Sequence, residues 1–573
     1  MSEETKGMFA GKSSPDPKSG YSLYQKGLSF NSSINLNETV RVNENFYIGK
    51  QWEGVQSNGL PTPQFNFLKR VVGFIVATIT TDNVKVTASA LANTAKTKEL
   101  IEPVRIVNEE FEALAERNRI PSLLREFARN AAVDGDGCMY TYWDAEEESG
   151  QTTRGAIKTE IIENNRVFFG NPNDRRVQNQ PWIIISNREI VRRVRRRAEQ
   201  NGFDDWEAIT ADTDDRDIDP AKTNTDDDKV TVLLLLWRNE DSGKIWAYEF
   251  TRNCAVKKAW DTGLRLYPIT WLPWDYVQDN YHGQAMITGL IPNQMFVNKV
   301  WAMAMISLMR TAYPKYVYDN TRIKKLDNRV GAAIGIPGGD MTNVIKAIDP
   351  ATISPQISQF IDMAIRQTEE SLGATSVALG DTRPDNTSAI IALQRAASTP
   401  TEMTKQNLYQ CIEDLFRIYL DFMGEYYGKR TVDTEPPKEV QEAFAFAGQP
   451  APEEIQVEFD FSMLKQHPMV LKLDVGASSY YSEIAAMQTL DNLLMNGHIT
   501  VVQYLERIPD GYIPARRALI SEILKAQQPP PPEKPAGGGG VIDQGLKPDI
   551  PTGGGFGALQ RKVLESGTTQ GLI

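Results

Sequence analysis

The residues with the clearest potential for chemistry lie near the N-terminus, in Gly7-Met8-Phe9-Ala10-Gly11-Lys12-Ser13. A phosphate-binding loop has four residues between its two glycines, so that the backbone amides converge on the phosphates. Here only three residues separate Gly7 from Gly11, and no apolar strand precedes them. The segment therefore does not predict a nucleotide site.

A second candidate is a calcium site at Asp134-Gly135-Asp136-Gly137. An EF-hand loop needs glycine at its sixth position and a bidentate glutamate at its twelfth. Met139 and Ala145 occupy these positions. The segment instead predicts a turn between a helix and a strand, because glycine and aspartate both favour turns.

The histidines and cysteines do not form a recognisable metal site. The chain has three of each, and they are far apart in sequence: His282, His467, His498, Cys138, Cys254 and Cys411. No histidine has a partner at a ligand spacing, so we expect no zinc, and the few cysteines indicate a reducing cytoplasm without a disulfide framework. Catalytic and dinucleotide-binding motifs are also absent from the sequence. We expect no metal and no cofactor.

Two segments of opposite charge lie next to each other. Six arginines occur within residues 188–197, and residues 204–228 are rich in aspartate. The arginines could form a nucleic-acid patch. We favour a solvated helix that the acidic segment neutralises, because adjacent blocks of opposite charge cancel each other at distances beyond about a Debye length. The formal net charge of −12 also argues against a protein that binds nucleic acid through its overall charge.

The elements that would position any site suggest an α+β fold. The first 34 residues are polar and aperiodic, which predicts disorder and no signal peptide. Residues 35–280 predict a mixed α/β domain with an antiparallel sheet. Its helices are expected at 36–46, 67–80, 97–118, 122–133 and 188–197, and its strands at 138–143, 156–169, 182–185, 230–237 and 245–250.

The helix expected over residues 286–312 is apolar around most of its circumference. Such a helix must be buried on most sides. Its best apolar run, residues 300–309, is about half the length needed to cross a bilayer, so we expect a soluble protein. The partners that bury this helix are then other protein, in particular neighbouring copies of the same chain.

The chain after this helix alternates between compact and extended segments. A β-rich insert begins after Tyr313, a helix begins at Ser354-Pro355, and a polar loop spans residues 376–387. A long helix then runs to about Tyr427 and is kinked by Pro400. A strand is expected at 455–463, short helices at 482–495, 500–507 and 514–525, and a disordered Pro/Gly-rich tail after residue 526.

Several short phrases within this order of elements resemble those of a known family. They are Phe46-Tyr47-Ile48-Gly49-Lys50-Gln51-Trp52, Pro63-Gln64-Phe65-Asn66, Leu379-Gly380-Asp381, Asn386-Thr387-Ser388-Ala389-Ile390 and Glu425-Tyr426-Tyr427. Over residues 35–525 the chain resembles the portal proteins of tailed double-stranded DNA bacteriophages. The resemblance rests on element order and short phrases together, since no single motif is diagnostic.

The resemblance implies a portal-like protomer with a mixed α/β wing, a helical stem, a small β-containing clip and a helical crown. The implied segments are a disordered N-terminal arm (1–34), wing (35–280), stem helix (281–312), clip (313–353), second stem helix (354–373), tunnel loop with long kinked helix and wing strand (374–475), crown (476–526) and disordered tail (527–573).

The family also implies roles for particular residues. The tunnel loop would line the channel with Leu379, Gly380, Asp381, Arg383 and Asn386. The clip would face DNA, a terminase or an adaptor with Lys315, Arg322, Lys324, Lys325 and Arg329. The stem would pack between subunits through Trp301, Met303, Met305 and Ile306.

The function implied by the resemblance is a ring of twelve copies at one capsid vertex, without enzymatic activity of its own. Double-stranded DNA would pass through its channel during packaging and ejection. The implied partners are the terminase large subunit, a head-tail adaptor, and the major capsid and scaffold proteins, with assembly in the host cytoplasm and no membrane. Net acidity suits such a conduit, because strong phosphate pairing would tether the DNA. The alternatives are a packaging enzyme of the terminase NTPase or nuclease type, and a self-assembling virion scaffold or adaptor without a channel.

Overall fold

The structure is a computed structural model of the 573-residue chain. The residues it describes are 14–57, 59, 61–81, 84–90, 101–151, 154–213, 228–312, 316–325, 336–337, 344–347, 356–371, 401–434, 455–466, 469–475, 480–508, 513, 516, 519–520 and 523. The chain divides into two compact units, Met1–Ala485 and Ala486–Ile573, which are described separately.

The larger unit contains a five-stranded antiparallel sheet in the order β4-β5-β6-β7-β8. Its strands are β4 (Val167–Phe169), β5 (Trp182–Ile190), β6 (Lys229–Arg238), β7 (Ile245–Phe250) and β8 (Ala255–Asp261). Alternate residues of β5 enter different cores: Trp182 and Ile184 belong to one cluster, and Ile183 and Ile185 to another. Both faces of the sheet are therefore covered, as the long apolar runs in these strands require.

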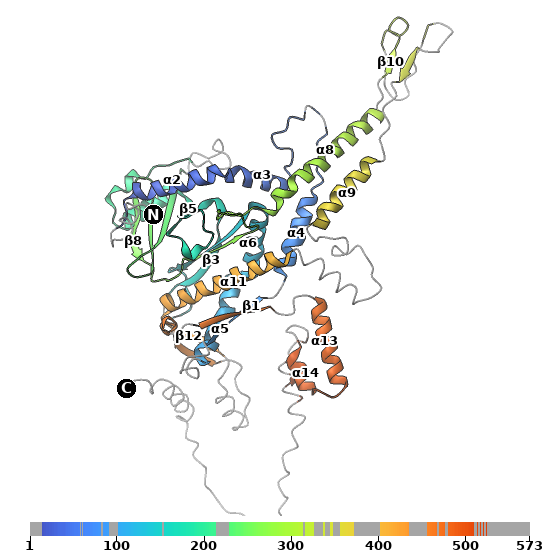
Figure 1. Ribbon diagram of the computed structural model, residues 1–573. Helices are drawn as coiled ribbons and strands as arrows, with labels where there is room; N and C mark the ends of the chain where they lie inside the picture. The colour runs from blue at the N-terminus through green and yellow to red at the C-terminus, as the bar shows by residue number, and fades with distance from the viewer. Residues whose placement is uncertain are drawn as a thin grey trace, which may run out of the picture. The chain divides into compact units, whose positions relative to one another are not determined.

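Helix α2 (Pro17–Ser33) covers one face of this sheet, so the prediction that residues 1–34 are disordered is wrong for this segment (Figure 1). Leu23 and Tyr24 of the helix are buried against the sheet. The helix approaches closely because it has glycines seven residues apart on that side. A Cβ at Gly20 would lie 2.6 Å from the Phe250 ring, and one at Gly27 would lie 2.6 Å from the Phe168 ring. Glycines that look like disorder in the sequence are here a packing surface.

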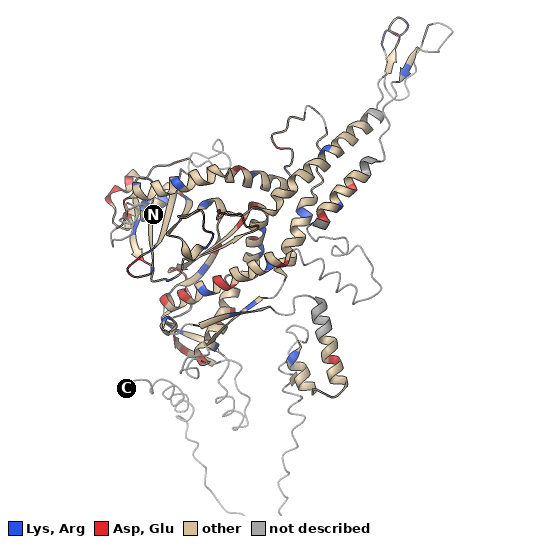
Figure 2. Ribbon diagram, viewed as in Figure 1, with Lys and Arg blue, Asp and Glu red and all other residues tan. Residues whose placement is uncertain are grey.

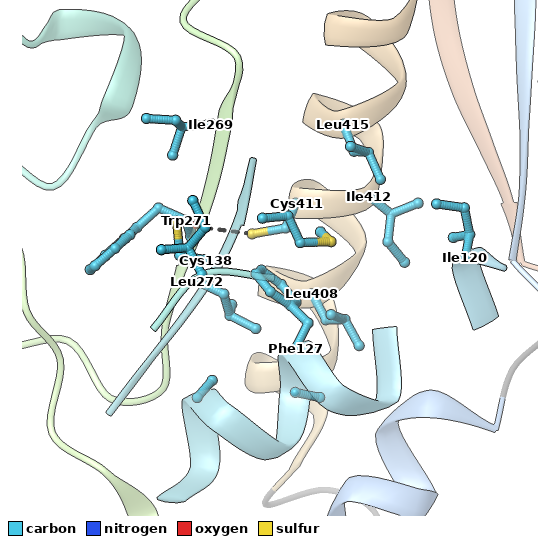
Figure 3. Packing of buried hydrophobic residues seen from close by; sticks show 14 of the residues in the cluster. Ile120, Phe127, Cys138, Ile269, Trp271, Leu272, Leu408, Cys411, Ile412 and Leu415 are labelled. Atoms are coloured by element: carbon cyan, nitrogen blue, oxygen red, sulfur yellow. Dashed lines mark hydrogen bonds between the residues drawn. The ribbon is translucent and has the colours of Figure 1, made fainter. Parts of the chain in front are cut away.

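A second sheet has three strands in the order β3-β2-β9, and helices pack against it. Its strands are β2 (Asp136–Asp144), β3 (Ala156–Ile161) and β9 (Ile269–Pro273), and the helices of this region are α3 (Leu36–Ile48), α4 (Phe67–Thr80), α5 (Ile101–Arg117), α6 (Ile120–Asp134) and α11 (Glu402–Phe422). Figure 3 shows α11 packing on β9, where the Cys411 thiol lies 3.4 Å from the Trp271 carbonyl oxygen. Burial raises the pKa of this thiol far above its usual range, so it serves as an apolar core residue.

Helices α8 (Met286–Ala312) and α9 (Gln356–Ser371) form a pair that extends beyond the sheets of the larger unit (Figure 1). Two short antiparallel strands, β10 (Tyr316–Tyr318) and β11 (Ile345–Ala347), belong to the segment between them. Asn293 Nδ2 of α8 donates a hydrogen bond to Thr368 Oγ1 of α9, at 3.0 Å. The sequence-based bounds of the first helix, 286–312, are confirmed.

Further elements are found among the described residues of both units. In the larger unit they include α7 (Val191–Gln200), a short π-helix (Met423–Tyr427), and the strand pairs β12–β13 (Lys429–Thr434 with Ile455–Asp460) and β1–β14 (Val84–Ala90 with Met469–Val475). Helix α13 (Tyr480–Met495) spans the boundary, and α14 (Val501–Arg507) lies in the smaller unit. Helices and largely antiparallel sheets together confirm the α+β class.

Some predicted features lie outside the described residues. They include the tunnel loop and the kink at Pro400, and the tail over 527–573. The strand expected at 455–463 ends earlier, because residues Phe461–Lys465 form a 3₁₀ turn capped by the Asp460 side chain.

Candidate functional site

The motifs that suggested chemistry have structural roles or lie outside the described residues. The segment from Gly7 to Ser13 is outside them. The turn at Asp134–Gly137 ends α6 and begins β2, as expected. Within the described part of the chain, no cluster of three or more histidine, cysteine and carboxylate side chains could hold a metal ion, and no helix is long and apolar enough to cross a membrane.

Asp136 of this turn organises the start of α8. The carboxylate is 1% exposed, accepts a hydrogen bond from the Gly283 amide at 2.7 Å, and lies 2.7 Å from His282 Nδ1. The other ring nitrogen of His282 lies 3.3 Å from Asn31 Oδ1 of α2. A buried charge requires such partners. Because 146 residues separate Asp136 from His282, no spacing rule in the sequence could reveal the pair.

The arginine-rich helix α7 has two kinds of arginine. Arg188, just before the helix, pairs with Asp212, and Arg197 pairs with Glu189 and Glu249. The exposed arginines of the helix are Arg192, Arg193 and Arg196. The ion pair with Asp212 supports the interpretation that the acidic segment offsets the arginines. Residues 214–227 of that segment lie outside the described chain.

Helix α8 is buried on one side and exposed on the other over its first four turns. Ile287, Leu290, Val297 and Val300 pack into the main core. On the opposite side, Met295 is 41% and Phe296 45% exposed. Large apolar side chains at this exposure on a rigid helix mark an interaction surface when they are contiguous.

Further along α8, a second side of the helix also becomes exposed. Met305, Leu308 and Met309 are 38%, 60% and 47% exposed. Met305 and Leu308 follow Trp301 at spacings of four and seven residues, so they continue the side that the protomer covers near Trp301. The neighbouring α9 also exposes Phe360 and Met363, at 56% and 55%. The helix pair therefore presents apolar surface in more than one direction.

The four residues predicted for subunit packing divide between these two sides. Trp301 is half-buried and stacks on Phe65, with ring centroids 4.6 Å apart and an interplanar angle of 30°. Met305 lies on the same side as Trp301. Met303, at 58% exposure, and the half-buried Ile306 lie on the side of Phe296.

A buried amide network fixes α8 to the segment that precedes α4. Gln294 Nε2 donates to the Phe65 carbonyl at 2.6 Å and to Asn298 Oδ1 at 2.9 Å. Asn298 Nδ2 donates to Gln51 Oε1 at 2.6 Å. Gln51 and Phe65 belong to the two aromatic phrases that carry the family resemblance, and their structural role is to hold this helix. Sequence reasoning missed the network because its members are about 230–250 residues apart.

Charge is sparse on α8 (Figure 2). Lys299 is the sole charged residue among positions 286–309, and it is exposed on the side of Phe296. An apolar helix with little charge at its surface favours protein contacts over solvent.

Asp134, at the end of α6, has a perturbed pKa. Burial and the Glu44 charge raise this pKa to about 8, against the opposing effect of Arg129.

The predicted clip residues are partly described. Arg322 is half-buried, Lys324 and Lys325 are exposed, and Lys315 and Arg329 lie outside the described residues. Ile323, which follows β10, and Val344, which precedes β11, are 4% and 2% exposed, so the segment around these strands buries apolar side chains. Leu379, Gly380, Asp381, Arg383 and Asn386 of the predicted tunnel loop all lie outside the described residues.

The part of the chain that contains the α8–α9 helix pair matches a known protein family. Residues 183–434, which include α8, β10, β11, α9 and α11, match the model of the phage P22-like portal protein family. The resemblance to phage portal proteins is confirmed. The match covers 252 of the 573 residues, which is less than half of the chain.

Other comparisons add less about this portal-like chain. No curated protein matches it at a significant level. A solved structure described as "Virion of native gene transfer agent (GTA) particle" is similar over 84% of this chain and 93% of that chain, with 10% identity and a TM-score of 0.35. A likeness at that TM-score does not establish a shared fold.

Proposed function

We propose that the chain is the protomer of a portal ring of twelve copies at one capsid vertex. The ring forms the channel through which double-stranded DNA is packaged and ejected. The observation that carries the proposal is the pair of exposed apolar sides on α8, one with Phe296 and Met303, the other with Met305 and Leu308. A protomer with two different adhesive sides associates head to tail, and such association closes into a ring when the rotation allows.

In this proposal α8 and α9 are the stem, and the segment with β10 and β11 is the clip. The layered sheets before α8, together with α11 and β12–β14, are the wing, and α13 and α14 belong to the crown. The clip presents Arg322, Lys324 and Lys325 to the terminase large subunit and afterwards to a head-tail adaptor. The wing contacts the major capsid and scaffold proteins, and assembly takes place in the host cytoplasm.

The tunnel loop, residues 376–387, is proposed to line the narrowest part of the channel. Replacing residues 381–386 with a Gly/Ser linker is expected to impair DNA packaging or retention while rings still form. Loss of rings in this variant would contradict the assignment of the loop.

The test of the ring itself is the substitution Met303→Lys. A charge on this side of α8 would be desolvated at the subunit contact, so rings seen by negative-stain imaging should disappear while the circular dichroism spectrum is unchanged. Met403→Lys is the matched control, because Met403 is an apolar side chain of the same type that is 77% exposed on α11 and not on α8 or α9. Rings that persist in Met303→Lys would overturn the proposal.

The same images, together with an ATPase assay, separate the alternatives. Rings with a central hole of DNA width support the portal. Closed shells or small oligomers would favour a scaffold or adaptor without a channel, and ATP hydrolysis by the purified protein would favour a packaging enzyme.

A further inference from the structure

An aromatic platform lies beside α8, on the side of Trp301. We define it as Phe65, Trp301 and Met305. Phe65 stacks on Trp301 at 4.6 Å yet keeps 45% of its surface exposed, and Met305 follows one turn further along the helix with 38% exposed. Exposed aromatic rings backed by a packed surface are typical of the residues that dominate protein interfaces.

The platform is held rigidly before any partner arrives. Gln294 Nε2 donates to the Phe65 carbonyl at 2.6 Å, and Trp52 Nε1 donates to the Pro63 carbonyl at 2.9 Å. Asn66 caps α4 by accepting from the Lys69 amide at 3.1 Å. Because these bonds fix the segment on both sides of Phe65, little conformational entropy remains to be lost on binding.

A complementary stripe lies on the opposite side of the same helix, formed by Phe296, Lys299 and Met303. The spacings of three and four residues place the three side chains in one row. Met303 is two positions after Trp301, which is a rotation of about 200° around the helix. The stripe and the platform therefore face away from each other and cannot meet within one copy.

We propose that the stripe of one copy packs on the platform of the next copy in the ring. This inference rests on the proposed portal function, in which α8 runs along the channel wall. In a closed ring, equivalent atoms lie at equal height along the axis. Met303 is only about 3 Å along the helix from Trp301, so it stands level with the neighbouring platform.

Charge complementarity selects the same pairing. Lys299 in the stripe and Glu53 in the segment before the platform are both exposed. Within the described part of the chain neither is within ion-pair distance of an opposite charge, and the electrostatic neighbour of Glu53 is Arg41, which itself pairs with Glu38. Gln51 bonds to Asn298, which places the segment carrying Glu53 at the level of Lys299. Across the subunit contact, Lys299 of one copy lies beside Glu53 of the next.

The test is a disulfide across the contact. The double variant Phe65→Cys/Met303→Cys is oxidised mildly and run on a non-reducing denaturing gel. Because each copy is linked to the next, the expected result is a ladder of covalent multimers up to the ring. The native cysteines are buried and do not interfere. Each single variant should give at most dimers, as should Met303→Cys combined with Met403→Cys, whose second thiol is exposed elsewhere.

The outcomes separate this inference from the function on which it rests. Rings that form without a ladder overturn the pairing and leave the portal function intact. If the wild type forms no rings, the portal function fails and the pairing with it.

Charge reversal gives a second test that does not depend on thiol chemistry. Lys299→Glu and Glu53→Lys should each lower the yield of rings roughly tenfold, because like charges then face each other across the contact. The double reversal should restore the yield to within about twofold of the wild type. Failure of the double variant to recover, with both single variants folded, would overturn the pairing.

Discussion

Asp136 Oδ2 lies 2.7 Å from His282 Nδ1, and the two side chains are completely buried where β2 meets the segment that leads into α8. The other carboxylate oxygen accepts from the Gly283 amide at 2.7 Å. This pair joins the three-stranded sheet to the segment immediately before α8, the helix that carries the proposed ring contacts.

Removing the Asp136 carboxylate should be costly. Asp136→Ala leaves the Gly283 amide and His282 without their acceptor in a buried site, and we expect a loss of about 3–5 kcal/mol in the free energy of unfolding. Asp136→Asn retains an acceptor, so its loss should be about 1–2 kcal/mol. Urea denaturation measures both, and a result for Asp136→Ala below about 1 kcal/mol would contradict the structure. Asp144→Ala, which breaks an ion pair with the partly exposed Lys158, is the surface control.

The bond between Asn298 and Gln51 should appear as energetic coupling. Asn298→Leu and Gln51→Leu each leave a buried amide unpaired, which costs about 1–3 kcal/mol. The loss of unfolding free energy in the double variant should be smaller than the sum of the two single losses by about 0.5–3 kcal/mol. With both amides replaced by leucine, neither one remains in the core without the partner that the other supplied. A double-mutant cycle of urea midpoints measures the difference. Strict additivity would show that the 2.6 Å bond contributes nothing.

Asp134 should make stability depend on pH in the direction opposite to most carboxylates. Burial and the Glu44 charge raise its pKa to about 8, above the value of about 3.9 expected in the unfolded chain. The folded state is therefore destabilised by Asp134 least below about pH 4, where the carboxyl is protonated in both states. Its contribution to stability is lost as the pH rises towards 8. Between pH 5 and 8.5, the free energy of unfolding of Asp134→Asn should rise relative to that of the wild type by a few kcal/mol, on the order of 1.4 kcal/mol per pKa unit. Thermal unfolding of both proteins across that range tests the sign, and parallel curves would exclude the shift.

Gly27 should tolerate no side chain, whereas Gly73 should. A Cβ at Gly27 would lie 2.6 Å from the Phe168 ring, so Gly27→Val should detach α2 and cost about 2–4 kcal/mol through lost packing. Gly73 is exposed in α4, and no atom lies within 4 Å of an added Cβ there. Gly73→Ala should therefore raise the free energy of unfolding by about 0.5–1 kcal/mol. Limited proteolysis within residues 17–33 reports detachment directly. Equal protection in Gly27→Val and the wild type would show that the close approach is unimportant.

Several features of the fold are readable from the sequence alone. The bounds of α4 and α8 coincide with the apolar patterns that predict them, and the turn at residues 134–137 follows from its glycines and aspartates. The unusual apolarity of α8 also indicates self-association. These predictions succeed because a helix, its cap and a turn depend on residues a few positions apart.

The tertiary structure alone decides which of these residues meet. Gly20 and Gly27 resemble a disordered arm until Phe250 and Phe168 are placed against them. Asp136 finds His282, and Gln51 finds Asn298, across separations of 146 and 247 residues. The two exposed sides of α8 can be distinguished only once the protomer has covered the rest of that helix. Local patterns determine elements, but contacts between distant segments depend on how whole layers pack, which short-range periodicity does not encode.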